Sequence, residues 1–421
     1  MNASTPRAAA ESYTGGLHRP RDRRRPLTGR LLTAALLLPF TLPVHAQVQA
    51  PCEASSYGMQ ADGSDSTAAL GKALAECAGR TVHIAAGTYT FSPQGFAVGI
   101  KVPGGTTLLG DGAQGPQQTV LRVAGSGTFQ GFLWVRNVSN VAIRGIRLEG
   151  SPYDSGCARH FDYGHAIYVE SDPNESARVD NVEISDDTFY NFNGFSWVTL
   201  NAGERSPGIN AATISNNFFY SDAHLTGHCA VLGMVYTAAM ISIHGANLSA
   251  QGLVTNVAVT SNTMNAGYVK EGVAIWSGTN SISVKNNLII DTGLHLPRPP
   301  GAELGRYAIL VYNSAYDNPG LHPDSISIVD NTITNPVSCG VYVAGGKNME
   351  ISRNRISGQI DRNDGTLLKG AIALNHADNV YSLEGNELAN NYIGISSIGG
   401  KVNLGNNRIT VPPGGMATKF R

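Results

Sequence analysis

A short phrase recurs from residue 182 onwards and restricts the fold of the chain more than any other feature. Each copy has alternating apolar residues, then an Asn or Asp, then a further apolar pair. The Asn or Asp recurs about every 31 residues on average, a period typical of stacked repeats. The position is occupied in turn by Asp187, Asn217, Asn262, Asn287, Asn331, Asn354, Asn386 and Asn407.

Alternation of apolar and polar residues with a period of two predicts strands. We expect a turn at the Asn position, because Asn tolerates left-handed backbone angles, and an earlier copy has Gly145 there. A third strand follows in each period and is usually opened by Gly, as in residues 272–278 and 339–345. Three short strands per turn, stacked about 4.8 Å apart, predict an all-β, single-stranded right-handed parallel β-helix. Its Asn side chains should form a ladder inside one corner.

Composition agrees with this solenoid and disfavours other folds. Only 14% of the residues are charged and 49 are Gly, which is unlike a helical bundle or a coiled coil. Asn-Gly and Asp-Gly turns, typical of antiparallel hairpins, are scarce. The sequence therefore disfavours a propeller or a sandwich.

Residues 1–46 are predicted to be a signal peptide that is removed. They combine an Arg-rich stretch, an apolar run over 31–42 and a small-residue cleavage site, Val44-His45-Ala46, before Gln47. The run is shorter than the roughly 20 residues that span a membrane, so we expect a secreted or periplasmic protein with no membrane span. The remaining chain has 23 Lys and Arg against 29 Asp and Glu, a net charge of −6. Nucleic acid is therefore not an expected partner, and the oligomeric state is not readable.

The five cysteines all follow residue 46, which fits an oxidising compartment. Cys52 and Cys77 bracket the predicted N-terminal cap, so we expect a disulfide between them. Cys157 and Cys229 are a second candidate pair. No C-x-x-C spacing is present, so cysteine spacing predicts no zinc site.

The N-terminal end of the mature chain is predicted to be a cap over residues 47–80, followed by the β-helix over residues 81–421. Residues 68–78 are rich in Ala and Leu and predict a short capping helix over the open end of the solenoid. The stretches DGSDSTAALGKAL at 62–74 and IAAGTY at 84–89 resemble the opening of pectate-lyase-like β-helix proteins. That superfamily includes phage tailspikes, polygalacturonases and polysaccharide lyases. The resemblance spans residues 55–411 and implies the fold more strongly than the activity.

Three long insertions precede Gly-opened strands, at residues 150–164, 221–238 and 291–306. Because a solenoid repeats its geometry, they should project from one edge and wall a groove over that sheet. The resemblance implies that substrate lies along this sheet. Alternation predicts the inward residues of its strands, which are Ile167, Val169, Val198, Leu200, Ile241, Ile243, Val273, Ile275, Ile309, Val311, Val341 and Val343.

The outward positions and the edge of the same sheet supply the candidate site. We expect catalysis by Lys270, His244 and Arg306, which lie on consecutive coils. Carbohydrate rings stack on aromatic side chains, and polar side chains bind their hydroxyl groups. The expected substrate-binding residues are Tyr168, Glu170, Asn201, Trp276, Glu271, Tyr307, Tyr312 and His165.

This set of cations and a His favours β-elimination from a uronate. A cation must neutralise the carboxylate, a base must take the adjacent proton, and an acid must protonate the leaving oxygen. Lys270 and Arg306 resemble in position the Lys base and Arg acid of the chondroitin- and alginate-lyase family with this fold. The sequence thus predicts a polysaccharide lyase whose partner is an acidic polysaccharide or oligosaccharide. We expect no metal site and no required cofactor, although dependence on Ca²⁺ is not readable.

Three alternatives stay open. A glycoside hydrolase needs two nearby carboxyl groups. Glu170 and Glu271 lie three coils apart, about 14 Å. An acid on one of the first two insertions would therefore have to supply the second carboxyl group. We assign Asp186 and Asp187, at the Asn corner, a structural role. A uronate C5-epimerase would use the same residues as the lyase, although the Asp-Pro-His-Asp motif of mannuronan epimerases is absent. A non-catalytic carbohydrate-binding or adhesin-like β-helix would use the aromatics alone.

Overall fold

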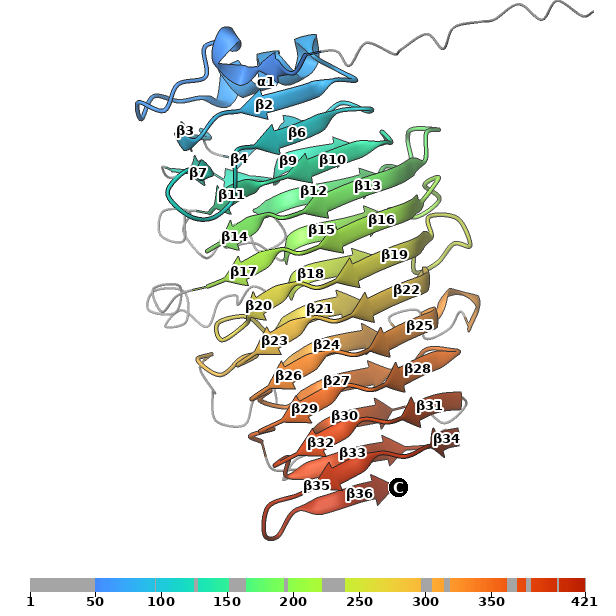
Figure 1. The fold of residues 1–421 in the computed structure, drawn as a ribbon. Coiled ribbons are helices and arrows are strands. Elements are labelled where there is room, and N and C mark those ends of the chain that lie inside the picture. The colour runs from blue at the N-terminus through green and yellow to red at the C-terminus, as the bar shows by residue number, and fades with distance from the viewer. Residues whose placement is uncertain are drawn as a thin grey trace, which may run out of the picture. The chain divides into compact units, whose positions relative to one another are not determined.

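A computed structural model describes residues 50–94, 96–124, 128–150, 164–192, 196–221, 239–296, 305–313, 319–361, 369–375, 380–399 and 401–420. Their strands form three long sheets in which all neighbouring strands run parallel. Figure 1 shows successive coils stacked from the end that carries α1 to β36. The predicted all-β parallel β-helix with a short N-terminal helix is confirmed.

The first sheet, sheet 1, has twelve strands. They are β1 (Cys52–Glu53), β2 (Thr81–Ile84), β6 (Thr107–Gly110), β10 (Val141–Arg144), β13 (Val179–Ser185), β16 (Ile209–Ser215), β19 (Val254–Thr260), β22 (Thr279–Lys285), β25 (Asp324–Val329), β28 (Met349–Ser352), β31 (Val380–Glu384) and β34 (Lys401–Leu404).

Sheet 2 follows sheet 1 across the Asn corner and has eleven strands. They are β3 (Gly87–Phe91), β7 (Thr119–Val123), β11 (Ile146–Glu149), β14 (Thr188–Tyr190), β17 (Phe218–Tyr220), β20 (Thr263–Asn265), β23 (Leu288–Ile290), β26 (Thr332–Thr334), β29 (Arg355–Ser357), β32 (Glu387–Ala389) and β35 (Arg408–Thr410). A small separate sheet pairs β4 (Phe96–Ala97) with β8 (Thr128–Phe129).

Sheet 3 contains the Gly-opened strands of the repeat and also has eleven strands. They are β5 (Ile100–Lys101), β9 (Gly131–Arg136), β12 (His165–Ser171), β15 (Ser196–Ala202), β18 (Ala239–His244), β21 (Glu271–Ile275), β24 (Tyr307–Tyr312), β27 (Cys339–Ala344), β30 (Gly370–Asn375), β33 (Ile393–Ile398) and β36 (Met416–Phe420). The twelve predicted inward side chains of this sheet are all fully buried, as alternation predicts.

The predicted Asn ladder runs along the corner between sheets 1 and 2. The backbone N–H of Asp187 donates to Asn217 Oδ1 at 2.9 Å. The same bond links each later pair, ending with Asn386 and Asn407, at 3.0 Å. Each rung satisfies a backbone donor that the corner would otherwise leave buried without a partner.

The turn differs from the sequence prediction in one respect. The left-handed backbone lies one residue before the ladder position, with φ of 58° at Asp186 and 57° at Asn216 and Asn286. The ladder residue itself is selected for its side-chain amide, which donates and accepts hydrogen bonds inside the corner. Each of these corners therefore uses two consecutive residues, first one with left-handed backbone and then one whose side chain bonds inside the corner.

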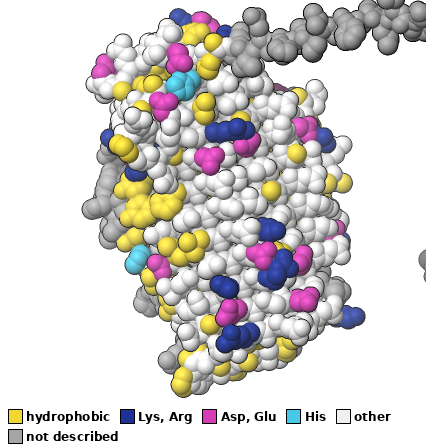
Figure 2. Space-filling view, viewed as in Figure 1, with side chains coloured by type: hydrophobic (Ala, Val, Ile, Leu, Met, Phe, Trp, Pro, Cys, Tyr) yellow, Lys and Arg dark blue, Asp and Glu magenta, His cyan; other side chains and the backbone are white. Residues whose placement is uncertain are grey.

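Charged side chains of the solenoid are largely matched by charges of opposite sign. On sheet 1, Arg144 pairs with Glu183 on the next coil, and Lys285 lies 3.9 Å from Asp330. Figure 2 shows Lys and Arg side chains lying beside Asp and Glu side chains on the face in view. This face therefore has no broad region of one sign.

The cap closes the N-terminal end of the core. Helix α1 (Thr67–Glu76) and the 3-10 turn η1 (Ala54–Tyr57) lie there; a second such turn, η2 (Pro319–Leu321), lies in a later coil. The helix buries Leu70, Ala73 and Leu74. It begins one residue before the predicted range and ends two residues earlier. None of the described helices is long and apolar enough to span a membrane.

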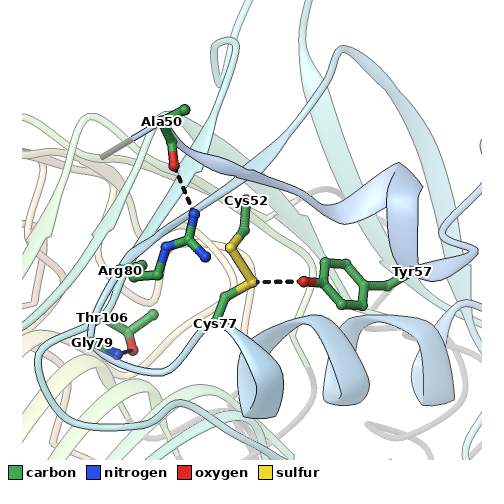
Figure 3. Close-up of a disulfide and its surroundings, with 7 residues drawn as sticks. All are labelled: Ala50, Cys52, Tyr57, Cys77, Gly79, Arg80 and Thr106. Atoms are coloured by element: carbon green, nitrogen blue, oxygen red, sulfur yellow. Dashed lines mark hydrogen bonds between the residues drawn. A yellow bond between two sulfur atoms is a disulfide. The ribbon is translucent and has the colours of Figure 1, made fainter. Parts of the chain in front are cut away.

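A disulfide holds the cap to the first strand. It joins Cys52 to Cys77, the pair expected from the sequence, and the Tyr57 hydroxyl donates to Cys77 Sγ at 3.1 Å (Figure 3). Cys339 is buried. The predicted signal peptide, its cleavage site and the pairing of Cys157 with Cys229 lie outside the described residues and stay predictions.

Candidate functional site

Sheet 3 places the predicted site residues in two groups at opposite edges. The leading edge, where the strands begin, carries Lys270, Glu271, Arg306 and Tyr307. Glu271 pairs in register with Tyr307, and the Tyr307 N–H donates to the Lys270 carbonyl at 2.9 Å. These four residues therefore lie on two adjacent coils, as predicted.

The trailing edge, where the strands end, carries His244, Trp276 and Tyr312. Glu271 is in register with Ala239, which begins β18, and His244 ends the same strand. Five residues of strand, about 16 Å at about 3.3 Å per residue, thus separate His244 from the leading edge. Lys270, His244 and Arg306 do not form one catalytic cluster, because alternation predicts the face of a residue and not its distance along the strand.

Glu271 has the strongest electrostatic perturbation of the leading edge. The residue is only 6% exposed. Burial raises the pKa of Glu271 to about 8, and the charge of Lys270 opposes this rise. The group therefore titrates near neutral pH, where a side chain can take or give a proton efficiently.

Arg306 is buried behind this edge. It is 2% exposed, and its Nη1 donates to the Gly293 carbonyl at 2.8 Å and the Leu296 carbonyl at 3.1 Å. These contacts hold the 293–296 turn against the start of β24. Arg306 thus positions a segment of the third insertion and places a permanent charge one coil from Lys270.

Sequence reasoning missed a third cation on this edge. Lys369 directly precedes β30, as Lys270 and Arg306 precede β21 and β24. Its Nζ lies 3.6 Å from an Asp361 carboxylate oxygen. The shared position before a Gly-opened strand was visible in the repeat and was the signal that could have identified it.

The trailing edge is an aromatic stack. The His244 ring lies on Trp276 with centroids 5.0 Å apart, and Trp276 meets Tyr312 edge-on at 5.1 Å. His244 Nε2 lies 2.5 Å from Ser242 Oγ. Burial, and to a smaller extent the charge of His165, lowers the pKa of His244 to about 3. The imidazole is therefore neutral at pH 7 and suits hydrogen bonding to a hydroxyl group better than charge neutralisation.

The remaining predicted residues form a polar cluster on earlier coils. Asn201 Nδ2 donates to the Tyr168 hydroxyl at 2.8 Å, and His165 Nδ1 lies 2.7 Å from the Ser196 carbonyl. Burial raises the pKa of Tyr168 to about 12. Its hydroxyl is therefore a hydrogen-bonding group at neutral pH, not a phenolate.

Glu170 belongs to an ion-pair network that the sequence did not predict. Trp134 Nε1 donates to Glu170 Oε2 at 3.1 Å, and Arg136 contacts both Glu170 and Asp172. Burial raises the pKa of Glu170, although the charge of Arg136 opposes the rise. Arg136 also lies 3.4 Å from Glu175, so three carboxyl groups share the guanidinium of Arg136.

The aromatic floor is less exposed than alternation suggested. Tyr168 and Tyr307 are 8% exposed and Leu310 is 5% exposed. Tyr307 stacks on Tyr342 with centroids 4.5 Å apart, and both belong with Leu310 to a second apolar cluster outside the solenoid core. Trp276 and Tyr312 are the partly buried members at its margin.

Two parts of the predicted site stay untested. Most of each groove-walling insertion, residues 151–163, 222–238 and 297–304, lies outside the described residues. Within the described ranges, no group of three or more His, Cys, Asp or Glu side chains is placed to hold a metal ion. The expectation that no cofactor is required remains a prediction.

No protein-family model matches the chain, and no curated protein matches it in sequence. Solved structures do match its fold. The A-module of mannuronan C-5 epimerase AlgE6 from Azotobacter vinelandii aligns with a TM-score of 0.56 and 16% identity over 88% of this chain and 95% of that chain. PfbA, a surface adhesin of Streptococcus pneumoniae, aligns with a TM-score of 0.57 and 14% identity over 88% and 93%.

An alginate lyase from Paenibacillus sp. str. FPU-7 aligns with a TM-score of 0.53 and 17% identity over 80% of this chain and 97% of that chain. At such identities the likeness shows the fold. The chain has the pectin-lyase-like parallel β-helix fold that the opening motifs predicted. Proteins with this fold include an epimerase, a lyase and an adhesin, so the fold leaves the chemistry to the site.

Proposed function

We propose that this protein is an exported enzyme that cleaves a uronate-containing polysaccharide by β-elimination at the leading edge of sheet 3. One observation carries the proposal. Glu271, a buried carboxyl group whose pKa is raised to about 8, lies next to Lys270 and in register with Tyr307. Acid, base and cation are the three groups that elimination requires, and here they occupy two adjacent coils.

In the proposed reaction, Lys270 binds the uronate carboxylate and the permanent charge of Arg306 strengthens the positive potential there. Neutralising the carboxylate acidifies the C5 proton, which the ionised form of Glu271 removes. The C4–C5 double bond forms as the C4–O4 bond breaks. The Tyr307 hydroxyl then protonates the leaving O4 oxygen.

The fold comparisons support the first step of this reaction. Epimerisation at C5 and β-elimination from a uronate both begin with loss of the C5 proton, and the chain is similar in fold to a mannuronan C-5 epimerase and an alginate lyase. The partly buried rings of Trp276 and Tyr312 support a pyranose-binding role for the trailing edge, because aromatic side chains pack well on sugar rings. His244 and Asn201 would contribute hydrogen bonds to hydroxyl groups.

The test is turnover of a polysaccharide panel containing alginate, polygalacturonate, chondroitin and neutral glucans. Elimination creates an unsaturated product, so we expect a rise in absorbance near 235 nm with at least one uronate polymer. Lys270→Ala and Glu271→Gln should each lower kcat/KM by about 10²–10⁴-fold. Lys285→Ala, which removes the same charge from the exposed end of β22, should leave it unchanged.

The pH profile adds an independent check. The base must be ionised, so kcat/KM should rise with pH through the pKa of Glu271, near 8. New reducing ends without a 235 nm product would contradict the lyase assignment. So would C5 hydrogen exchange with D₂O in an uncleaved polymer, which would indicate an epimerase.

A hydrolase is the second candidate, and the Glu170 network favours it. Arg136 holds Glu170 and Asp172 together, and the raised pKa of Glu170 suits a general acid. In that case Glu170→Gln would abolish the release of reducing ends, whereas Glu271→Gln would not. The two variants therefore separate the two chemistries.

A further inference from the structure

A polar pocket lies beyond the trailing edge, on the turns that connect sheet 3 to sheet 1. Three consecutive coils contribute to it, through residues 175–178, 205–209 and 250–255, and its volume is about 580 Å³. Arg178, Arg205, Ser176, Gln251 and Thr255 are among its lining residues. These turns directly follow the strands β12, β15 and β18, which carry Glu170, Asn201 and His244.

Hydrogen bonds between turns fix the walls of this pocket. The Glu204 carboxylate accepts the Leu248 N–H at 3.0 Å and the neighbouring Asn247 N–H at 2.5 Å, which ties the β15–β16 turn to the β18–β19 turn. Gly208 has φ +94°, and a Cβ there would lie 2.6 Å from the Leu253 carbonyl oxygen. The close approach of the two turns therefore requires glycine, and the pocket is preorganised.

Arg205 occupies an unfavourable backbone conformation at the rim of this pocket. Its φ is +63°, in the left-handed region that Gly adopts readily and that other residues adopt at an energetic cost. Its side chain is exposed and has no ion-pair or hydrogen-bond partner among the described residues. Arg178 lies on the adjacent coil and contacts Asp180 at 2.8 Å. Among the described residues, the guanidinium of Arg205 is therefore available to a ligand at this pocket, whereas that of Arg178 already contacts Asp180.

We propose that this pocket is a distal subsite that binds one carboxylate-bearing sugar unit of the polysaccharide substrate. The inference rests on the proposed function for the identity of the polymer. The Arg205 guanidinium can bind a carboxylate through two parallel hydrogen bonds, and Ser176, Gln251 and Thr255 can bind the sugar hydroxyls. A polymer in this subsite runs from the leading edge across His244 and Trp276, along the strands of sheet 3.

The test is affinity electrophoresis in gels that contain alginate, polygalacturonate, chondroitin or dextran. Every protein carries Lys270→Ala, so that the polymer is not consumed during the run. Arg205→Gly should weaken binding to the uronate polymer by about tenfold, the loss of about 1.4 kcal/mol expected for one charged contact. Dextran should not retard any of the proteins, and Arg178→Ala should weaken uronate binding less than Arg205→Gly.

Arg353→Gly is the matched control. Arg353 is also an exposed Arg in the left-handed region, with φ 52°, but it lies at the Asn corner and pairs with Asp330 at 2.8 Å. The Arg353→Gly substitution removes the same charge at the same kind of backbone position. The uronate affinity of this variant should therefore equal that of the parent. Arg205→Gly relieves backbone strain and should not lower the melting temperature, which excludes unfolding as the cause of weaker binding.

The outcomes separate this inference from the proposed function. Equal retardation of the Arg205→Gly protein and its parent by the uronate polymer would overturn the subsite, while the lyase assignment would stand on its 235 nm product. Weaker retardation of Arg205→Gly by a polymer that gives no unsaturated product would support the subsite and contradict the lyase. A parent protein that no uronate polymer retards would overturn the subsite.

Discussion

Asp187 is the exception in the Asn ladder, and its chemistry is that of a buried acid. Its Oδ1 accepts the Ile146 N–H at 2.8 Å, whereas Oδ2 is buried with no hydrogen-bond partner. Burial raises the pKa of Asp187 well above its usual value, and the charges of Asp186 and Glu183 act in the same direction. Burial thus favours the protonated form of this ladder residue.

We predict that Asp187→Asn stabilises the protein. In the ladder, Asn217 Nδ2 donates to the Ile184 carbonyl, and the new amide would make the equivalent bond to Ile143. Filling a buried unsatisfied site should add about 1–3 kcal/mol to the free energy of unfolding. The measurement is thermal melting of both proteins between pH 4 and pH 8.

The pH dependence of the gain has a definite sign. A carboxyl group whose folded pKa is raised contributes stability below its unfolded pKa, about 3.9, and loses that contribution as pH rises towards the folded pKa. As pH rises from 4 to 8, the native protein should lose the stability that protonated Asp187 contributes, and the Asn variant has no such contribution to lose. The advantage of the variant should therefore grow from pH 4 to pH 8; a constant or shrinking advantage would contradict a raised pKa.

Alternation predicted individual residues well inside the solenoid and poorly at its margin. The inward pairs of sheet 3, such as Val273 and Ile275, are fully buried because the pleat is regular there. Tyr307 has the same parity as the inward Ile309 yet packs against Tyr342 in the outer cluster. The first residue of a strand lies at the end of the pleat, so its orientation depends on the chain before it.

At the scale of elements, the cap is joined to the first coils by a chain of side chains on sheet 1. His83 on β2 bonds Glu53 of β1 through Nδ1 and Asp111, just after β6, through Nε2, both at 2.8 Å. Partial burial lowers the pKa of His83, but the hydrogen bonds to the two carboxylates outweigh it, and the net shift is upward. Through these two bonds, His83 links three neighbouring strands of sheet 1, β1, β2 and the end of β6.

We predict that His83→Gln destabilises the protein at low pH only. Since the folded pKa of His83 is raised, its contribution is complete below the unfolded value of about 6.5 and is lost as pH rises through the folded pKa. Because both carboxylates are partly exposed, the expected loss is only about 0.5–1 kcal/mol at pH 5.5. Urea unfolding at pH 5.5 and pH 9 measures it; an equal loss at both pH values would show that the charge of His83 is not involved.

The elements themselves were predicted more completely than the site they support. Period-two alternation and the Asn position located the strands of sheets 1 and 2, and helix α1 differs from its predicted range by one residue at the start and two at the end. The sequence placed Lys270 and Arg306 at the loop-side edge and His244 on the outward face, but it did not give the length of strand between them. That separation follows from the pairing of Ala239, at the start of β18, with Glu271.

The two ends of the whole solenoid are stabilised differently. At the N-terminal end, helix α1 covers the core and the Cys52–Cys77 disulfide closes a loop with a sequence separation of 25. At the other end, the last coil leaves Leu404, Met416 and Phe420 at 45%, 38% and 52% exposed. In such a stack each coil contacts only its neighbours. The stability of a coil is then the sum of its intrinsic free energy of folding and the free energies of its interfaces with those neighbours.

We therefore predict that unfolding begins at the C-terminal end. Backbone amides of β34 and β36 should exchange with D₂O faster than those of β2 and β6, because opening the last coil breaks one interface and an inner coil is held by two. Cys52→Ser should remove about 3 kcal/mol of stabilisation from the cap. Exchange in β2 and β6 should then accelerate while exchange in β34 stays the same. If the substitution accelerates all coils equally, the solenoid unfolds as a single cooperative unit, and the ends have no separate stability for the cap to protect.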